Sequence, residues 1–196
     1  MNSLSEIYST LHSESILDVN NIDYKNCDKG TCHSYIDFYE QLFSHLKEQP
    51  VNVLEIGIYG GISILLWERY FKNSEKIVGV DIDLTWVQDK VVNESKTNKK
   101  IQLIQHDASV PSLLDVLDST DTYDIIIDDG SHWVGHQLAT FNILKSRMKV
   151  GGIYIIEDIQ NDGEASYLKN SIPNSEIIDL RGIKNRYDDL VLVYRA

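Results

Sequence analysis

The sequence predicts an α/β fold: a seven-stranded, mostly parallel sheet with helices on both faces and an antiparallel hairpin at its end. Short apolar runs alternate with longer amphipathic segments after Pro50, as in strands joined by helical crossovers. The last two apolar runs are joined by a polar loop with no room for a helix, which favours antiparallel pairing. Strands are expected near residues 51–56, 76–81, 101–105, 123–128, 152–157, 175–180 and 189–195.

The spacing of apolar residues also predicts the helices. Apolar residues recur at helical spacing from Leu4 to Leu11, which predicts a short amphipathic helix before an irregular, Asn- and Asp-rich segment. Apolar positions keep a 3.6-residue period again between about residues 31 and 47, and Pro50 prevents this helix from continuing. After Pro50, helices are expected near residues 61–72, 84–94, 110–118, 133–148 and 163–170.

The composition fits one domain with an acidic surface. With 196 residues, 42% of them hydrophobic, we expect a helical cap segment at residues 1–49 and a core at residues 50–196. Lys and Arg number 18 against 30 Asp and Glu, which gives a formal net charge of -12. Such a charge repels phosphate backbones and anionic membranes, so neither nucleic acid nor a membrane is an expected partner.

Cysteine usage and the chain start favour a reducing compartment. Cys27 and Cys32 are the only cysteines, too few for a disulfide framework or a four-cysteine zinc site. The first residues lack a basic segment followed by an apolar one, and no apolar run approaches a membrane span of about 18 residues. We therefore expect a cytoplasmic protein.

A glycine turn follows the first predicted strand. Glu55-x-Gly57-x-x-x-Gly61 leads from that strand into a helix, and glycine there lets backbone N–H groups approach a ligand closely. The spacing matches neither the Gly-x-Gly-x-x-Gly dinucleotide pattern nor a P-loop. The turn therefore indicates either a nucleotide-binding turn or an ordinary connection between strand and helix.

Acids also follow the second and third predicted strands. Asp81 ends the second strand, where a carboxylate can accept hydrogen bonds from both ribose hydroxyls of a nucleotide. Asp107 follows the third strand and could either cap the next helix or receive an adenine amino group. Because ligands of open parallel sheets bind at the carboxyl ends of the strands, acids after three successive strands favour a nucleotide site.

This series of motifs resembles the class I S-adenosylmethionine-dependent methyltransferases, whose Rossmann-like sheet has a terminal antiparallel hairpin. The resemblance covers residues 50–196. It implies that Glu55, Gly57 and Gly61 hold the methionine portion of the cofactor, Asp81 the ribose and Asp107 the adenine. The Asn/Asp-Pro-Pro-Tyr/Phe motif of base-modifying N-methyltransferases is missing after the fourth strand, which agrees with the acidic charge.

Two further runs end in paired acids: Asp128-Asp129-Gly-Ser-His132 and Glu157-Asp158. Neighbouring strands lie about 4.8 Å apart, so Asp129 can converge with the second pair on one cation. Oxygen ligands without cysteine select Mg²⁺, or Mn²⁺ as a substitute. His132 would then be placed to remove a proton from an acceptor hydroxyl.

Alternation along a strand turns Asp128 away from Asp129, so we assign Asp128 to orienting the cofactor or the loop. In the alternative interpretation, Asp128 and Asp129 are helix caps and His132 begins the helix. That interpretation leaves the pair Glu157 and Asp158 unexplained.

The string Tyr-Asp-Ile-Ile-Ile-Asp-Asp-Gly-Ser-His and the later Gly-Gly-Ile-Tyr-Ile-Ile-Glu-Asp resemble the macrocin and mycinamicin type of sugar O-methyltransferase, a group that overlaps with proteins labelled cephalosporin hydroxylase. The resemblance implies metal ligands at Asp129, Glu157 and Asp158, and a base at His132. The segment Asp28-Lys-Gly30, with the residues that follow it up to Tyr39, is similar to the segment that closes over the cofactor in that group. This chain is shorter than the macrolide enzymes, and we expect it to lack their extra amino-terminal domain and long substrate lid.

We therefore predict an S-adenosylmethionine- and Mg²⁺-dependent O-methyltransferase acting on a sugar with vicinal hydroxyls, in a glycan, a nucleotide sugar or a glycosylated metabolite. A catechol-type acceptor is an alternative, because its two phenolic oxygens could bind the metal in the same way. An iron and 2-oxoglutarate hydroxylase is a second alternative, which leaves Asp81 and Asp107 without a role; a binding protein without chemistry is a third. Of the three tryptophans, only Trp133 is placed near the site. The sequence is compatible with a homodimer through the amino-terminal helices and equally with a monomer.

Overall fold

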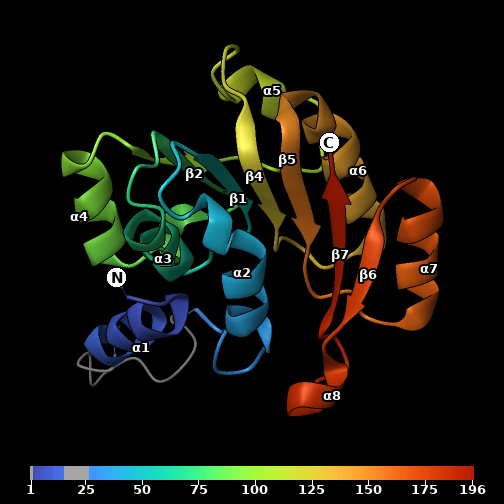
Figure 1. Cartoon of the computed structure of the whole chain (residues 1–196). Helices are drawn as coiled ribbons and strands as arrows, with labels where there is room; N and C mark the ends of the chain where they lie inside the picture. The colour runs from blue at the N-terminus through green and yellow to red at the C-terminus, as the bar shows by residue number, and fades with distance from the viewer. Residues whose placement is uncertain (1, 16–26) are drawn as a thin grey trace.

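The computed structural model describes residues 2–15 and 27–196, and it shows one seven-stranded sheet (Figure 1). The strands lie in the order β3-β2-β1-β4-β5-β7-β6. Their bounds are β1 Asn52–Ile56, β2 Lys76–Asp81, β3 Ile101–Gln105, β4 Tyr123–Asp128, β5 Met148–Ile156, β6 Glu176–Asp179 and β7 Leu190–Arg195. The Asn- and Asp-rich segment predicted after the first helix lies outside the described residues.

Eight α-helices are assigned in the described part of the chain. They are α1 Leu4–Ser15, α2 Tyr35–Phe43, α3 Ile62–Tyr70, α4 Asp89–Thr97, α5 Leu113–Val116, α6 Val134–Leu144, α7 Asp162–Ser171 and α8 Arg181–Lys184. Short 3₁₀ turns lie at Ser44–Leu46, Leu84–Trp86 and Lys145–Arg147. None of the helices in the described ranges is long and apolar enough to cross a membrane.

The sheet is parallel except at one edge. β1 lies between β2 and β4, and all three run in the same direction, as do β3 and β5. β7 pairs antiparallel with both β5 and β6. In Figure 1 the arrows of β4 and β5 point to one edge while β7 runs the other way. The predicted fold class, including the antiparallel hairpin, is confirmed.

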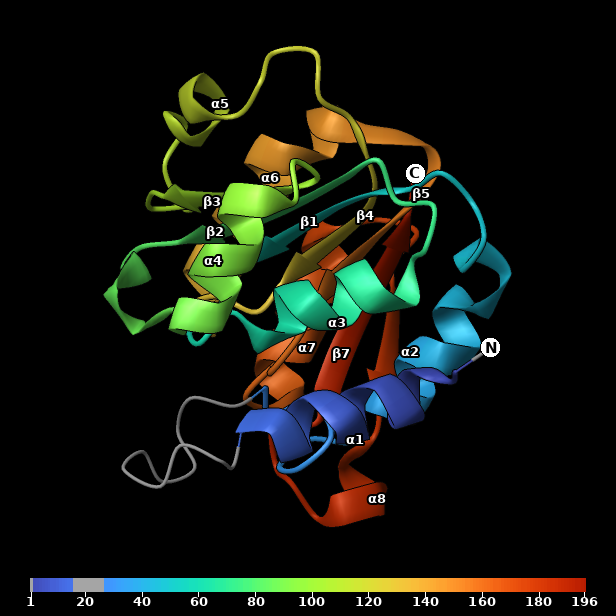
Figure 2. The ribbon, with the colours of Figure 1, turned by 90° about the vertical axis from the view of Figure 1, so that its left-hand side faces the viewer.

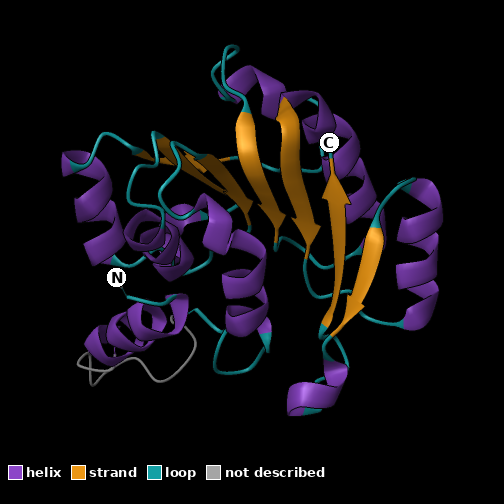
Figure 3. Cartoon of the chain, in the orientation of Figure 1, coloured by secondary structure: helices purple, strands orange, loops and turns teal. Residues whose placement is uncertain are grey.

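Helices cover both faces of this sheet (Figures 2 and 3). On one face, α1, α2, α3 and α4 contribute apolar side chains to a core that contains Val53 and Ile125 from the sheet. On the other face, α5, α6 and α7 pack over Leu54 and Ile126. Since successive strand residues point to opposite faces, β1 and β4 supply one residue to each core in turn.

The amino-terminal segment shares the first of these cores. Leu4 and Leu11 of α1 are fully buried, and so are Tyr35 and Phe43 of α2. The apolar spacing therefore predicted both helices, although α2 begins at Tyr35 and ends in a 3₁₀ turn rather than spanning residues 31–47.

Two of the predicted helices are interrupted or shorter. The helix expected near residues 84–94 is divided, because the Asp83 side chain caps the turn at Leu84–Trp86 and Gln88 is extended before α4 begins. The helix expected near residues 110–118 is only Leu113–Val116, since Leu117 is extended.

The expectation that the hairpin loop has no room for a helix is wrong. A single helical turn, α8, lies between β6 and β7. The Asp179 carboxylate accepts the backbone N–H of Arg181 at 3.0 Å and pairs with its guanidinium at 2.7 Å, which favours a turn at this point. Four residues suffice for one turn, so the loop did not need the length of a crossover helix.

Candidate active site

The carboxyl ends of the three central strands meet at one edge of the sheet. The N–H of Asp129 donates to the carbonyl of Ile56 at 2.9 Å, and the N–H of Glu157 donates to the carbonyl of Asp128 at 2.9 Å. These bonds extend the parallel ladders just past the ends of β1, β4 and β5. The loops that begin with Gly57, Asp129 and Glu157 therefore lie next to one another, as the sequence predicts.

Gly57 makes a close backbone approach at this edge. Its φ is +79°, and a Cβ atom placed on it would lie 1.9 Å from the carbonyl oxygen of Asp129. Any other residue would force apart the loops after β1 and β4. Gly61 also has a positive φ, +77°, at the start of α3.

Asp81 is bound to the same glycine turn. Its Oδ2 atom accepts the backbone N–H groups of Ile58 and Tyr59, at 2.9 and 2.8 Å. Gly57 and Asp81, together with Gly130, line two adjoining cavities of about 640 and 220 Å³. Cavities therefore lie at the edge of the sheet where the sequence predicts a nucleotide site.

The smaller cavity is lined by Asp81, Asp107, Asp128 and two histidines, His106 and His136. Asp107 Oδ1 accepts the backbone N–H and the hydroxyl of Ser109, at 2.9 and 2.7 Å, and these bonds lower the pKa of Asp107. Asp107 therefore shapes its own loop as well as facing the cavity, and both interpretations of this residue remain compatible with the structure.

Asp128 faces the opposite side of the strand end from Asp129. Its Oδ1 atom accepts the N–H of Gly130 at 3.3 Å, and its Oδ2 atom lies 3.5 Å from the Tyr154 hydroxyl. Burial raises the pKa of Asp128 to about 7. The alternation argument that separated Asp128 from Asp129 agrees with these contacts.

Glu55 points into the core behind the cleft. It is fully buried, and its Oε2 atom accepts the indole N–H of Trp67 at 3.0 Å. Its Oε1 atom lies 3.3 Å from the Lys29 ammonium group. The contact of Glu55 with the methionine portion of a cofactor remains a prediction. In the structure, the Glu55 carboxylate contacts Lys29 and Trp67.

Asp129, His132 and Asp158 converge beside the larger cavity, which Asp129 and His132 line. Each offers a ligand atom, and these atoms lie within 4.8 Å of one another. His132 Nε2 is 3.2 Å from Asp129 Oδ1, and His132 Nδ1 is 3.5 Å from Asp158 Oδ2. His132 and Asp158 both have positive φ values, 57° and 55°, an uncommon conformation for side-chain-bearing residues that turns these two toward the cluster.

Glu157, the third predicted ligand, belongs to the same cluster through Lys29. The Lys29 ammonium lies 2.7 and 2.8 Å from the two Glu157 oxygens and 2.6 Å from Asp129 Oδ2. All three residues are largely buried. Lys29 was not among the predicted site residues, and the only sequence signal for it was its position in the segment Asp28-Lys-Gly30.

The charged groups of this cluster affect one another's pKa values. Burial would lower the pKa of Lys29, but Asp129, Glu157 and Glu55 raise it well above its usual value, so the amine stays charged. Burial would raise the pKa of Asp129, yet Lys29 and His132 lower it to about 2. Burial raises the pKa of Glu157 further than Lys29 can lower it.

His132 is affected by the carboxylates on both sides of its ring. Burial alone would lower its pKa, but the hydrogen bond to Asp129 and the charges of Asp129 and Asp158 raise it to about 9. Burial and the charge of Asp129 raise the pKa of Asp158 to about 6. These contacts therefore favour the protonated imidazole at neutral pH.

The donor set fits a hard divalent cation. Asp129 and Asp158 supply carboxylate oxygens, the ligands that Mg²⁺ prefers, whereas Glu157 lies outside that group of atoms and binds Lys29 through both of its oxygens. Two tyrosines of α2 donate to the same acids: Tyr39 to Glu157 Oε1, and Tyr35 to Asp158 Oδ1 at 2.5 Å. Such hydrogen bonds fix the orientation of ligand carboxylates.

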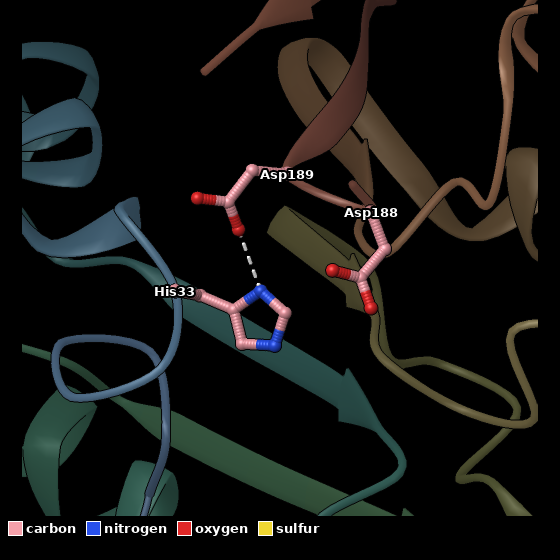
Figure 4. Close-up of side chains that lie close together, drawn as sticks. All are labelled: His33, Asp188 and Asp189. Carbon is pink, nitrogen blue, oxygen red and sulfur yellow. Dashed lines mark hydrogen bonds and ion pairs between the residues drawn. The ribbon is translucent and has the colours of Figure 1, made fainter. Parts of the chain in front are cut away.

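Figure 4 shows a second group of ligand-type side chains, His33, Asp188 and Asp189. This group lies beside the cluster, because His33 Nδ1 is 3.4 Å from Asp158 Oδ1. Asp189 Oδ1 lies 2.7 Å from His33 Nδ1, and Arg186 contacts Asp188 Oδ2 at 3.0 Å. Because the imidazole is already paired and a guanidinium supplies positive charge, we interpret this group as a hydrogen-bonded network rather than as a second ion site.

Trp133 was the only tryptophan predicted near the site, but Trp67 also lies close to it. Trp133 is 62% exposed and packs edge-on against His136, with ring centroids 4.6 Å apart. Trp67, which had no predicted role at the site, lies directly behind it through its bond to Glu55.

Comparison with known proteins agrees with this geometry. A family model described as a methyltransferase domain matches residues 54–159. An 8-demethyl-8-alpha-L-rhamnosyl tetracenomycin-C 2'-O-methyltransferase from Streptomyces olivaceus is 36% identical over 141 residues, which cover 68% of this chain and 35% of that protein. Demethylmacrocin O-methyltransferase from Streptomyces fradiae is 31% identical over 170 residues, which cover 82% of this chain and 41% of that protein.

A solved structure gives the same result. MycE methyltransferase from the mycinamycin biosynthetic pathway, in complex with Mg, SAH and mycinamycin VI, is 29% identical with a TM-score of 0.62, covering 80% of this chain and 37% of that chain. The chain thus spans well under half the length of the relatives named here. The family match over more than half of the residues shows that the chain belongs to the methyltransferase family.

Proposed function

We propose that this chain is the catalytic core of an S-adenosylmethionine- and Mg²⁺-dependent O-methyltransferase that acts on a sugar hydroxyl. The observation that carries the proposal is the convergence of Asp129, His132 and Asp158, the first two of which line the same cavity as Gly57 and Asp81. The site of the methyl donor, the ligands of the cation and the proton acceptor His132 would then lie at one edge of the sheet.

The two adjoining cavities suit the two halves of the cofactor. Asp81 stands where they join and would accept the ribose hydroxyls, while Asp107 in the smaller cavity would face the adenine. The turn from Gly57 to Gly61 lines the larger cavity and would hold the methionine portion. S-adenosylmethionine supplies an activated methyl group, so the protein has mainly to align it with the acceptor oxygen.

Asp129, Glu157 and Asp158 would hold the metal. A bound divalent cation supplies Lewis acidity that lowers the pKa of an acceptor hydroxyl. Carboxylates engaged with a cation also attract the His132 proton less strongly, which brings the imidazole toward the neutral form that can accept a proton. His132 would take that proton from the acceptor hydroxyl as the methyl group is transferred.

The relatives support a sugar as the acceptor. Their names give as acceptors an 8-demethyl-8-alpha-L-rhamnosyl tetracenomycin-C, L-olivosyl-oleandolide and demethylmacrocin, of which the first two names contain a glycosyl group. Sugars present neighbouring hydroxyls to a metal, as the predicted vicinal diol requires. A glycosylated small molecule is the acceptor class that we propose.

The test is methyl transfer from S-adenosylmethionine to a panel of rhamnosylated and other glycosylated compounds, nucleotide sugars and catechols. Turnover on a glycoside that stops with EDTA and returns with Mg²⁺ supports the proposal. Turnover that EDTA leaves unchanged contradicts the metal dependence, and turnover confined to catechols contradicts the sugar acceptor.

A further inference from the structure

The terminal hairpin holds the loop before α2 in place. Asp189, fully buried at the hairpin, accepts from His33 Nδ1 at 2.7 Å through Oδ1 and from the Ser34 N–H at 3.2 Å through Oδ2. Lys184 of α8 donates to the carbonyls of His33 and Thr31, at 2.8 and 3.2 Å. Side chains more than 150 positions later in the chain thus fix the backbone that leads into α2.

This loop sets the position of Tyr35. The imidazole of His33 stacks on the Tyr35 ring, with centroids 4.9 Å apart and planes inclined by 18°. The Tyr35 hydroxyl donates to Asp158 Oδ1 at 2.5 Å, and His33 Nδ1 lies 3.4 Å from the same oxygen. Both His33 and Tyr35 are almost completely buried, so water does not compete at these contacts.

The two carboxylate oxygens of Asp158 therefore have different partners. Oδ1 is engaged by Tyr35, whereas Oδ2 faces the cluster, 3.5 Å from His132 Nδ1. Asp158 has a left-handed φ of 55°, which an aspartate adopts at some energetic cost unless its surroundings hold it. Tyr35 is one of the groups that do so.

We propose that Tyr35, fixed by the pair His33 and Asp189, is a positioning residue that presents Asp158 Oδ2 to the metal. The inference rests on the proposed function, because it requires Asp158 to be a ligand. Hydrogen-bonding partners of ligand carboxylates orient them and affect metal affinity by about ten- to a hundredfold. Asp189 would act on Asp158 through His33 and Tyr35.

The variant Tyr35→Phe tests this, because it removes only the hydroxyl. The probe is Mn²⁺, whose binding to the whole chain is followed by electron paramagnetic resonance. We expect Mn²⁺ affinity to fall about tenfold or more, with the affinity for S-adenosylhomocysteine unchanged. Tyr123→Phe is the matched control: it removes another buried tyrosine hydroxyl, at the start of β4, and should leave Mn²⁺ affinity as it was.

If Tyr35 had only a structural role, Tyr35→Phe would lower the affinities for Mn²⁺ and for S-adenosylhomocysteine together. Loss of Mn²⁺ affinity alone therefore indicates that Tyr35 positions Asp158. In an Asp158→Asn background the effect of Tyr35→Phe should shrink to less than about twofold, because the two changes act on one contact. A folded Tyr35→Phe protein that binds Mn²⁺ as tightly as the unchanged chain overturns the inference. Absence of Mn²⁺ binding by the unchanged chain overturns the proposed metal site itself.

Asp189→Asn provides a second variant should Tyr35→Phe fail to fold. It keeps the shape of the side chain and an acceptor oxygen but weakens the bond to His33. We expect a smaller loss of Mn²⁺ affinity in the same direction. Unaltered Mn²⁺ affinity in that variant also overturns the inference.

Discussion

The ammonium nitrogen of Lys29 lies 2.6 Å from Asp129 Oδ2, although the two residues are 100 positions apart in the chain. Lys29 is 2% exposed and also contacts both oxygens of Glu157. One buried positive charge therefore balances acids to which we assign a divalent cation. The charge of Lys29 and the binding of the metal should be energetically linked, because both reduce the repulsion among the same buried carboxylates.

The first prediction concerns that link. Lys29→Met should destabilise the metal-free protein by about 3–5 kcal/mol, because it leaves buried carboxylates without a counter-charge. Mg²⁺ should then restore more stability in the variant than it adds to the unchanged chain. Thermal unfolding with and without Mg²⁺ measures both effects.

Lys149→Met is the control for Lys29→Met. Lys149 pairs with Asp124 at 2.7 Å but is 33% exposed, so its loss should matter little. If Mg²⁺ raises the unfolding temperature of all three proteins equally, the lysine and the metal are not coupled.

The second prediction concerns His132 as a base. His132→Ala should lower turnover by about 10²- to 10⁴-fold, the usual contribution of a positioned general base, while cofactor binding is retained. Initial rates and calorimetry with S-adenosylhomocysteine measure the two effects separately. His45→Ala removes an exposed histidine of the turn Ser44–Leu46 and should leave both unchanged. Normal turnover by His132→Ala would remove the residue from the mechanism.

The third prediction is the titration of His132. Its pKa of about 9 in the folded, metal-free protein exceeds the ordinary value of 6.5, so protonation of this group stabilises the fold. That contribution is complete below about pH 6.5 and is lost as the pH rises through about 9. Saturating Mg²⁺ should lower the pKa, because it engages the carboxylates that raise it. Imidazole NMR shifts followed against pH report both values, and an identical titration with and without Mg²⁺ would contradict the assignment of Asp129 and Asp158 as ligands.

The fourth prediction concerns the close approach at Gly57. Gly57→Ala should weaken cofactor binding and destabilise the fold, since its Cβ would lie 1.9 Å from a backbone oxygen. Gly151→Ala is the matched control: Gly151 has a φ of +80° but nothing within 4 Å of the added Cβ, so only a backbone strain of about 1–2 kcal/mol is expected there. Urea unfolding and calorimetry measure the differences. Equal unfolding free energies for the two variants would show that the clash is relieved without cost.

Local sequence pattern predicted the elements of the fold and the acids at their ends. Each strand is a short apolar run, and the register Ile56 to Asp128 and Asp128 to Ile156 follows from pairing such runs in parallel. Asp81 was identified because it ends a strand, and Asp129 and Glu157 because they follow strands directly. Their meeting at one edge follows from parallel direction alone.

The partners of those acids could not be predicted in the same way. Lys29 and Tyr35 reach Asp129 and Asp158 through contacts that span 100 and 123 positions, and no periodic pattern records such contacts. Glu55 shows the same limit: its position in the motif predicted a contact with the cofactor, whereas its burial against Trp67 depends on how α3 packs.

The most direct test of the central claim is crystallography of the chain soaked with Mn²⁺ and S-adenosylhomocysteine, using the anomalous signal of manganese. We expect one manganese peak bound by Asp129, Glu157 and Asp158 beside His132, with the nucleoside lying in the cavity along Gly57 and Asp81. A manganese peak elsewhere, or a nucleoside bound away from that cavity, would contradict the claim.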